Sequence, residues 1–188
     1  NSIKYFKIAS GFPFNSKDYS LNGEYKIITI KNVQDSGLDT SKVDRLLKLP
    51  ENLPSYCHLK VKDILISLTG NVGRICLVPE KNLLLNQRVG KIICEKPFQN
   101  YLYLTFLRPE ERSRFEKMST GTSQKNLSPI DAVAKKMILP PNDVLEKFNK
   151  IIDPILEKYI SCYVENQKLV KLRDWISPML MNGQVKVN

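Results

Sequence analysis

Short apolar runs separated by polar turns are spread over residues 1–140 of the chain. Alternating or continuous apolar residues at Lys26–Val33, Asp63–Leu68, Arg74–Pro79 and Gly90–Glu95 predict β-strands. The segment Thr69–Gly73 contains two glycines and joins two of these runs, which predicts a tight turn between paired strands. We therefore expect strand pairing to organise this part of the chain.

Helical signals follow the last of these strands. Tyr101–Leu107 is apolar over two helical turns, and Pro109 followed by two acidic residues is typical of the first turn of a new helix. These patterns predict two consecutive helices between Asn100 and Met118. The polar stretch Ser119–Asn126 has neither a helical nor a strand period and predicts a loop.

Two shorter signals end this part of the chain. Ser128 and Pro129 resemble an N-cap and the first position of a short helical turn. Lys136–Leu139 predicts one further strand, which Pro140 and Pro141 would end.

Beyond these prolines a helical period lasts to about Ile176. Steps of three and four residues visit a mostly apolar set: Leu145, Phe148, Ile152, Ile155, Tyr159, Cys162, Asn166, Leu169, Arg173 and Ile176. About 35 residues give a rod on the order of 50 Å, longer than the domain before it, so part of the helix should project. The alternative is a helix folded back on its own domain. Pro154 predicts a kink or a restart.

Composition adds the class of protein. With 188 residues, 42% hydrophobic and 26% charged, the chain is typical of one globular domain with an added element. No apolar run approaches the roughly 18 residues of a membrane span, so we expect a soluble, cytoplasmic protein with no membrane partner. We expect the four cysteines, which lie far apart in sequence, to be free thiols: Cys57, Cys76, Cys94 and Cys162.

The net charge of +10 is unevenly distributed. Residues 1–140 contain 22 Lys and Arg and 13 Asp and Glu, a net +9, whereas residues 141–188 contain 7 and 6, a net +1. Basic side chains that neutralise phosphates supply most non-specific nucleic-acid affinity. The charge of residues 1–140 therefore favours a polyanionic partner such as nucleic acid. A basic surface that serves solubility alone is the alternative.

Patterns that carry catalysis are weak. The single histidine, His58, has no cysteine or acidic cluster at metal-ligand spacing, and Gly70–Arg74 lacks the Gly-Lys-Ser/Thr of a phosphate-binding loop. Asp18 with Glu24 and Lys26 only weakly resembles the acidic pair with a lysine that nucleases use. The sequence favours a binding module over an enzyme, with no cofactor and no metal.

Polar loops supply the candidate DNA contacts. Asn and Gln side chains can read adenine edges, Arg reads guanine, and Ser, Thr and Lys contact bases or phosphates. Taken singly, each such residue more often stabilises a turn or stays solvated than contacts DNA. The candidate DNA-binding residues are Lys17, Asn71, Arg74, Asn86, Gln87, Arg88, Thr120, Ser123, Gln124, Lys125 and Asn126.

Several of these segments, in this order, carry a family resemblance. The ordered segments are Ser10–Phe14, Ser16–Tyr19, Ile28–Asn32, Asp63–Leu65, Thr69–Gly73, Asn86–Arg88, Gly121–Ser128, Ile138–Pro141 and Leu172–Gly183. With them the chain resembles one recognition domain and one spacer helix of a Type I restriction-modification specificity subunit.

The resemblance implies an α/β fold of the α+β type: a target-recognition domain with a strongly bent mixed β-sheet and short helices, then a long C-terminal helix of the coiled-coil type. It implies a DNA-recognition domain at residues 1–141, a spacer helix at 142–178 and a tail at 179–188. It further implies a non-catalytic subunit that reads one half of a bipartite site in double-stranded DNA. Methyltransferase (modification) subunits and a restriction subunit with motor and nuclease activity would be its partners.

The long helix would pair antiparallel with a counterpart, either a second half-subunit or a second copy in a homodimer. Because the chain resembles one half of the family pattern, both a naturally short subunit and the second half of a longer protein fit it. The residues expected at this pairing face are Phe148, Ile152, Ile155, Tyr159, Cys162, Asn166 and Leu169. A different reading is a helical assembly scaffold with only weak, non-specific nucleic-acid binding.

Overall fold

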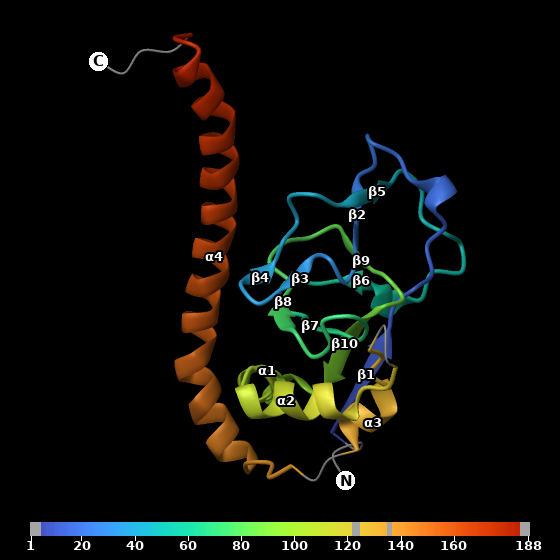
Figure 1. Cartoon of the computed structure of the whole chain (residues 1–188). Coiled ribbons are helices and arrows are strands. Elements are labelled where there is room, and N and C mark those ends of the chain that lie inside the picture. Colours follow the sequence, from blue (N-terminus) through green and yellow to red (C-terminus); the bar gives the residue numbers. More distant parts are fainter. Residues whose placement is uncertain (1–4, 122–124, 135–136, 185–188) are drawn as a thin grey trace.

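Two four-stranded β-sheets and one long helix form the framework of the computed structural model, which describes residues 5–121, 125–134 and 137–184 (Figure 1). The strands are β1 (Phe6–Ser10), β2 (Tyr25–Ile28), β3 (Val33–Gln34), β4 (Gly37–Leu38), β5 (Asp44–Leu46), β6 (His58–Leu59), β7 (Ile64–Ser67), β8 (Ile75–Leu77), β9 (Leu83–Leu85) and β10 (Val89–Cys94). The helices are η2 (Ser16–Asp18), η3 (Ser55–Cys57), η4 (Lys96–Phe98), α1 (Gln99–Phe106), α2 (Pro109–Met118), α3 (Pro129–Val133) and α4 (Asn142–Met181).

The first sheet is antiparallel, in the order β1-β10-β7-β8. The segments predicted at Asp63–Leu68, Arg74–Pro79 and Gly90–Glu95 are confirmed as β7, β8 and β10, and Thr69–Gly73 is confirmed as the turn between β7 and β8. Helices α1, α2 and α3 cover one face of this sheet (Figure 1). Phe106 and Phe115, both fully buried, fill the core between the helices and the sheet.

The second sheet, in the order β5-β2-β9-β6, is mixed because β2 and β9 run parallel while the other pairs are antiparallel. The strand predicted over Lys26–Val33 is wrong in extent: β2 ends at Ile28, and β3 begins only at Val33. The buried Asn32 side chain causes the break. It accepts a hydrogen bond from the Thr29 backbone N–H at 2.9 Å and donates to the Asp39 carbonyl at 2.9 Å, which closes a turn.

The helices after the first sheet follow their local signals. The two helices predicted between Asn100 and Met118 are confirmed as α1 and α2, and Pro109 occupies the first turn of α2. Ser128 caps α3, since its side chain accepts a hydrogen bond from the backbone N–H of Asp131.

The strand predicted at Lys136–Leu139 is wrong over its described part. Lys136 lies outside the described residues, and Met137–Leu139 joins neither sheet. Met137 and Leu139 pack against the core, while the Ile138 carbonyl accepts a hydrogen bond from the Tyr101 hydroxyl at 2.7 Å. The Tyr101 side chain thus supplies the hydrogen bond that a neighbouring strand would give the Ile138 carbonyl in a β-sheet.

Helix α4 spans 40 residues, or about 60 Å, along one side of the domain (Figure 1). It continues through Pro154, so the predicted restart is not observed. Its buried residues are Leu145, Leu156 and Ile160, which belong to the same core as the first sheet. Part of the helix therefore folds back on its own domain, as the alternative reading expected, and the rest extends beyond.

Polar contacts anchor α4 at several points. Lys62 forms ion pairs with Asp153 at 3.2 Å and with Glu157 at 2.9 Å. The amide of the buried Asn100 donates to Asp153 at 3.2 Å. Farther along, Gln167 donates to the carbonyl of Leu38 at 3.1 Å. In the part of the chain that the structure describes, none of the hydrogen bonds between α4 and the domain lies beyond Gln167.

The anchor at Asp153 predicts a pH dependence. The hydrogen bond from Asn100 and the ion pair with Lys62 hold the pKa of Asp153 below its usual range. A carboxyl with a lowered pKa stabilises the folded state above its unfolded pKa, and this stabilisation is lost as the pH falls through the folded value. Asp153→Asn should therefore unfold at a lower urea concentration than the wild type at pH 6, and the difference should shrink as the pH falls below the ordinary aspartate pKa and on through the lower folded pKa. A difference that stays constant with pH would contradict this role for Asp153.

No helix among the described residues is both long and apolar enough to cross a membrane. The long α4 does not qualify because its apolar residues alternate with charged ones along its length.

Candidate nucleic-acid interface

The turn between β7 and β8 presents Asn71 to solvent. Gly70 and Gly73 adopt positive φ angles of 73° and 80°, which glycine tolerates far better than other residues. Below the turn, the Ser67 hydroxyl donates to the Asn71 carbonyl and accepts a hydrogen bond from the Arg74 backbone N–H at 3.0 Å. The turn is thus held from inside, and the Asn71 side chain remains exposed.

A second turn, Asn86–Arg88, joins β9 to β10. It is closed by a hydrogen bond from the Val89 N–H to the Asn86 carbonyl at 2.9 Å, and the Gln87 N–H donates to the Phe12 carbonyl at 3.1 Å. Gln87 and Arg88 are exposed, whereas Asn86 is half-buried. The backbone of this turn contacts the strand that leads to the first turn, because the Leu68 N–H donates to the Arg88 carbonyl at 3.1 Å.

A third loop lies against the first turn. Thr120 and Asn126 exchange two backbone hydrogen bonds of 2.9 and 2.8 Å, which close the loop at its base. The Gly70 N–H donates to the Lys125 carbonyl at 2.9 Å, and the Leu127 N–H donates to the Leu68 carbonyl at 2.8 Å. Thr120, Lys125 and Asn126 are exposed.

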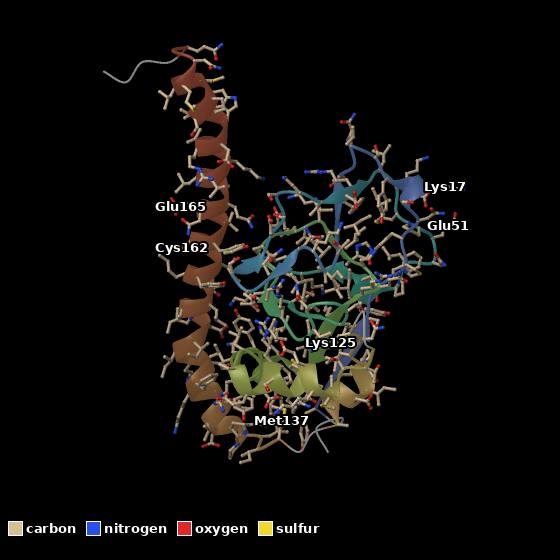
Figure 2. All side chains as sticks on the ribbon, viewed as in Figure 1. Lys17, Glu51, Lys125, Met137, Cys162 and Glu165 are labelled. Atoms are coloured by element: carbon tan, nitrogen blue, oxygen red, sulfur yellow. The ribbon has the colours of Figure 1, made fainter. Side chains whose placement is uncertain are left out.

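The backbone of Leu68–Gly70 thus contacts both other loops, and it brings together most of the candidate DNA-binding residues. We call these three segments, 69–73, 86–88 and 120–126, the loop cluster. Ser123 and Gln124 belong to it by sequence but lie outside the described residues. Lys17 is not part of it: it lies on η2, in a different region of the domain from Lys125 (Figure 2).

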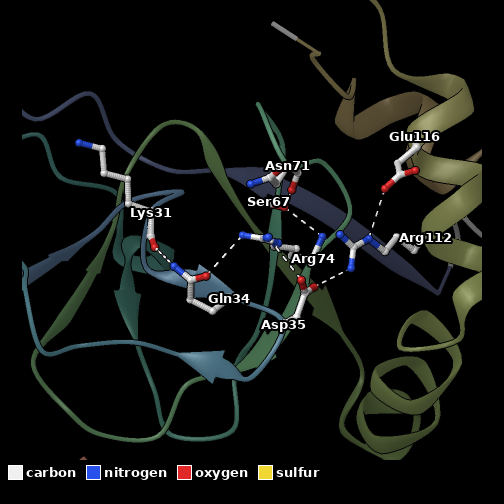
Figure 3. Close-up of polar contacts among 8 residues, drawn as sticks. All are labelled: Lys31, Gln34, Asp35, Ser67, Asn71, Arg74, Arg112 and Glu116. Atoms are coloured by element: carbon white, nitrogen blue, oxygen red, sulfur yellow. Dashed lines mark hydrogen bonds and ion pairs between the residues drawn. The ribbon is translucent and has the colours of Figure 1, made fainter.

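Arg74 has a different environment from the other candidates. Only 19% of its side chain is exposed, and its guanidinium lies 3.3 Å from a carboxylate oxygen of Asp35. Its other terminal nitrogen donates to the Gln34 side chain at 3.5 Å (Figure 3). Asp35 also binds Arg112 of α2 at 2.6 Å. The sequence reasoning missed this network, because nothing in the local pattern links residues so distant in the chain.

A stripe of largely exposed apolar side chains runs along α4 beside the face that packs on the domain, and Ile155 and Tyr159 border a pocket that domain residues also line. Ile155, Tyr159 and Leu169 are exposed by 56%, 42% and 55%. The same three-and-four spacing adds residues that the sequence reasoning left out at this face: Val144, Ile151 and Leu180. Phe148 and Cys162 are partly buried, and Asn166 is exposed. We call this set, without Ile152, the free stripe.

Ile152 needs a correction. It was expected at the pairing face with Ile155, but its side chain packs against the core of its own domain. The reason is geometric: at 100° per residue, Ile152 lies closer to the buried Leu156 than to the centre of the free stripe. Tyr159 also has an internal contact, since its ring stacks on Tyr163 with centroids 6.2 Å apart.

The metal-binding residue types and the thiols in the described part of the chain bear on whether it could carry catalysis. No cluster of three or more His, Cys, Asp or Glu residues there could hold a metal ion. The cysteines are free thiols, as predicted, and Cys57 and Cys76 are buried. Burial raises the pKa of Cys76, and it raises the pKa of Cys94 to about 11, which disfavours the reactive thiolate form of both.

Comparison with protein families gives one match over most of the chain. A family model described as the Type I restriction modification DNA specificity domain matches residues 5–173. A similar curated protein is the Type I restriction enzyme HindI specificity subunit of Haemophilus influenzae, which is 25% identical over 175 residues. The MjaIX specificity subunit of Methanocaldococcus jannaschii is 30% identical over 118 residues. The matches cover 92% and 61% of this chain but only 38% and 26% of those proteins, so the chain spans at most about two fifths of their length.

Solved structures show the same fold. The S subunit of a Type I restriction-modification system from M. genitalium superposes with a TM-score of 0.56 at 17% identity, over 95% of this chain and 44% of that one. The HsdS subunit from Thermoanaerobacter tengcongensis gives a TM-score of 0.56 at 15% identity, over 98% and 44%. The expected α+β class with a long C-terminal helix is therefore confirmed.

Proposed function

Because the chain belongs to the Type I restriction modification DNA specificity domain family, we propose that it is a recognition subunit that reads one half of a bipartite DNA site. In this proposal residues 1–141 contact double-stranded DNA, residues 142–178 of α4 form the spacer helix, and residues 179–188, which include the last three residues of α4, form a tail. The chain performs no chemistry itself and needs no cofactor. Methylation and cleavage belong to modification and restriction subunits that assemble on it, and DNA as the partner implies a cytoplasmic location.

The observation that carries the proposal is the loop cluster. Three separate segments bring exposed amides and cations to one place, and two of them are hydrogen-bonded to the backbone of Leu68–Gly70. Amide side chains such as Asn71 and Gln87 can form paired hydrogen bonds with adenine, whereas Arg88 and Lys125 can neutralise phosphates or bind guanine. Because two strand ends hold these loops in fixed positions, the arrangement favours sequence-specific over non-specific DNA binding.

The free stripe supports a helical partner. An apolar row with a three-and-four spacing is typical of helices that pair, and most of its side chains remain exposed beside the face of α4 that packs on the domain. We propose that its partner is a second spacer helix running antiparallel, supplied by a second half-subunit or by a second copy. In a two-fold homodimer the half-sites would be inverted repeats.

Selection from duplexes with a random central segment tests the proposal. The full chain, alone and with a modification subunit, should enrich a defined sequence over a scrambled duplex. Affinity should fall with log salt concentration at a slope of about 0.9 per phosphate neutralised, and Arg88→Ala or Lys125→Ala should each reduce that slope by about 1 if its cation binds a phosphate. Lys17→Ala is the matched control, because Lys17 lies outside the loop cluster. No enrichment with either preparation, or a flat salt response, would reject the function.

A further inference from the structure

Asp35 connects three elements of the fold at the edge of the loop cluster. It lies in the short turn between β3 and β4, and its carboxylate binds Arg112 at 2.6 Å and Arg74 at 3.3 Å. Arg74 directly follows the turn that carries Asn71, and Arg112 belongs to α2 (Figure 3). The Nε of Arg74 is buried and has no acceptor among the described residues, so Asp35 and Gln34 supply the partners of its guanidinium.

The hairpin that carries Asp35 is also attached to α4. Gln167 donates to the Leu38 carbonyl at 3.1 Å and accepts from the Thr40 hydroxyl at 3.2 Å. Gly37 has a φ of 127°, and a Cβ at this position would lie 2.6 Å from the Tyr163 ring. Movement of this hairpin against α4 is therefore restricted by both hydrogen bonds and close packing.

A carboxylate in this place needs an explanation if the loop cluster binds DNA. Its side chain is 56% exposed, and a negative charge beside phosphates opposes binding. The same charge pairs with two guanidinium groups and offsets part of their positive charge, which would otherwise attract any duplex regardless of its sequence. Asp35 therefore lowers the affinity for DNA of any sequence while it holds the turn 69–73 in one position.

We propose that Asp35 is a positioning residue for sequence discrimination. Through Arg74 it sets the turn 69–73 relative to the hairpin β3–β4 and hence to α4, and through both arginines it limits binding to non-cognate DNA. This inference rests on the proposed function and extends it to a residue that does not itself read a base.

Asp35→Asn tests the inference in the full chain. The probes are a duplex enriched from the random pool by the wild type and a scrambled duplex of the same length. Removing the charge should strengthen binding to the scrambled duplex by about 3- to 10-fold at low salt, and it should steepen the salt dependence by about 1 to 2 units as one or both arginines reach phosphates. The ratio of the two affinities should fall by about 10-fold, because loss of a held contact typically affects recognition on that scale.

Matched variants separate positioning from general damage. Glu116→Gln removes a different acidic partner of Arg112, which lies 3.3 Å away, and should leave the affinity ratio near that of the wild type. Asp35→Glu keeps the charge and should restore most of the ratio. Arg112→Gln should lower the ratio without strengthening binding to the scrambled duplex, because it removes a cation along with the bridge.

The outcomes also separate this inference from the function on which it rests. If the wild type enriches no sequence, the proposed function fails and the inference falls with it. If the wild type is selective and Asp35→Asn weakens both duplexes equally with an unchanged salt slope, Asp35 has only a structural role and the inference alone is overturned. An unchanged affinity ratio in a folded Asp35→Asn protein overturns it as well.

Discussion

Replacing Leu156 with alanine is expected to lower the free energy of unfolding by about 2–5 kcal/mol, as is usual for large-to-small changes in a packed core. Leu156 is 6% exposed and packs with the core formed by the first sheet and its helices. Ile155, its neighbour in sequence, is 56% exposed on the free stripe. Ile155→Ala is the matched control and should cost less than about 1 kcal/mol in the isolated chain, because little of its surface is buried.

Urea unfolding followed by circular dichroism measures both values. A loss for Ile155→Ala as large as that for Leu156→Ala would mean that both faces of α4 are packed on the domain. A small loss for both would mean that the helix stands free along its whole length. In either case the assignment of the two faces of α4 would have to be reversed or abandoned.

Placing aspartates at Ile155 and Leu169 together is expected to abolish pairing of the long helix. Both side chains are more than half exposed, so the domain should fold normally. In the paired state each change would bury a charge among apolar groups, which costs several kcal/mol unless it is compensated. The dissociation constant of the pair should therefore rise by at least about 100-fold, since each 1.4 kcal/mol corresponds to a factor of ten.

Sedimentation equilibrium of the full chain measures the change. Ser161→Asp is the control, because Ser161 is an exposed residue of the same helix on a different side from the free stripe, and it should leave the mass unaltered. A wild type that stays monomeric at high concentration would favour a second half-subunit as the partner over a second copy. Self-association that survives both aspartates would contradict the free stripe as the pairing surface.

Local signals accounted for the elements that the sequence predicted well. Pro109 with the acids after it marks the start of α2, Ser128 caps α3, and paired glycines mark the turn after β7. Each depends on residues close together in the chain, so the pattern carries the required information. The helical period after Pro141 likewise indicated the long α4.

Long-range pairing accounted for most of what the sequence did not reveal. Strand β9 is a short apolar segment that becomes a central strand only because β2 and β6 lie on either side of it. The predicted strand near Ile138 had a suitable pattern but no partner strand in reach. The helical period shows that a face of α4 is apolar but not which surface covers it, and Ile152, expected at the pairing face, packs on its own domain.

The candidate site likewise contains residues that local patterns identified and contacts that only the fold creates. Asn71, Gln87 and Lys125 were singled out by residue type within loops, and the structure brings their three loops together. That Arg74 would be held by Asp35 could not be inferred, since the two residues lie on different hairpins and an acidic residue was not expected beside basic loops. Lys17 is the opposite example: it was chosen as a basic residue in a polar segment, but the fold places it on η2, apart from the loop cluster.

The docking of α4 from Leu145 to Gln167 has a mechanical consequence. A recognition domain joined to its spacer by one flexible joint could swivel to follow a displaced half-site, but this one is attached along several helical turns. One base pair added between the half-sites moves the second by about 3.4 Å and rotates it by about 35° around the duplex. If the proposed function holds, the protein would have to bend α4 or twist the DNA to follow, so we expect the number of base pairs between the half-sites to be selected along with the bases that are read.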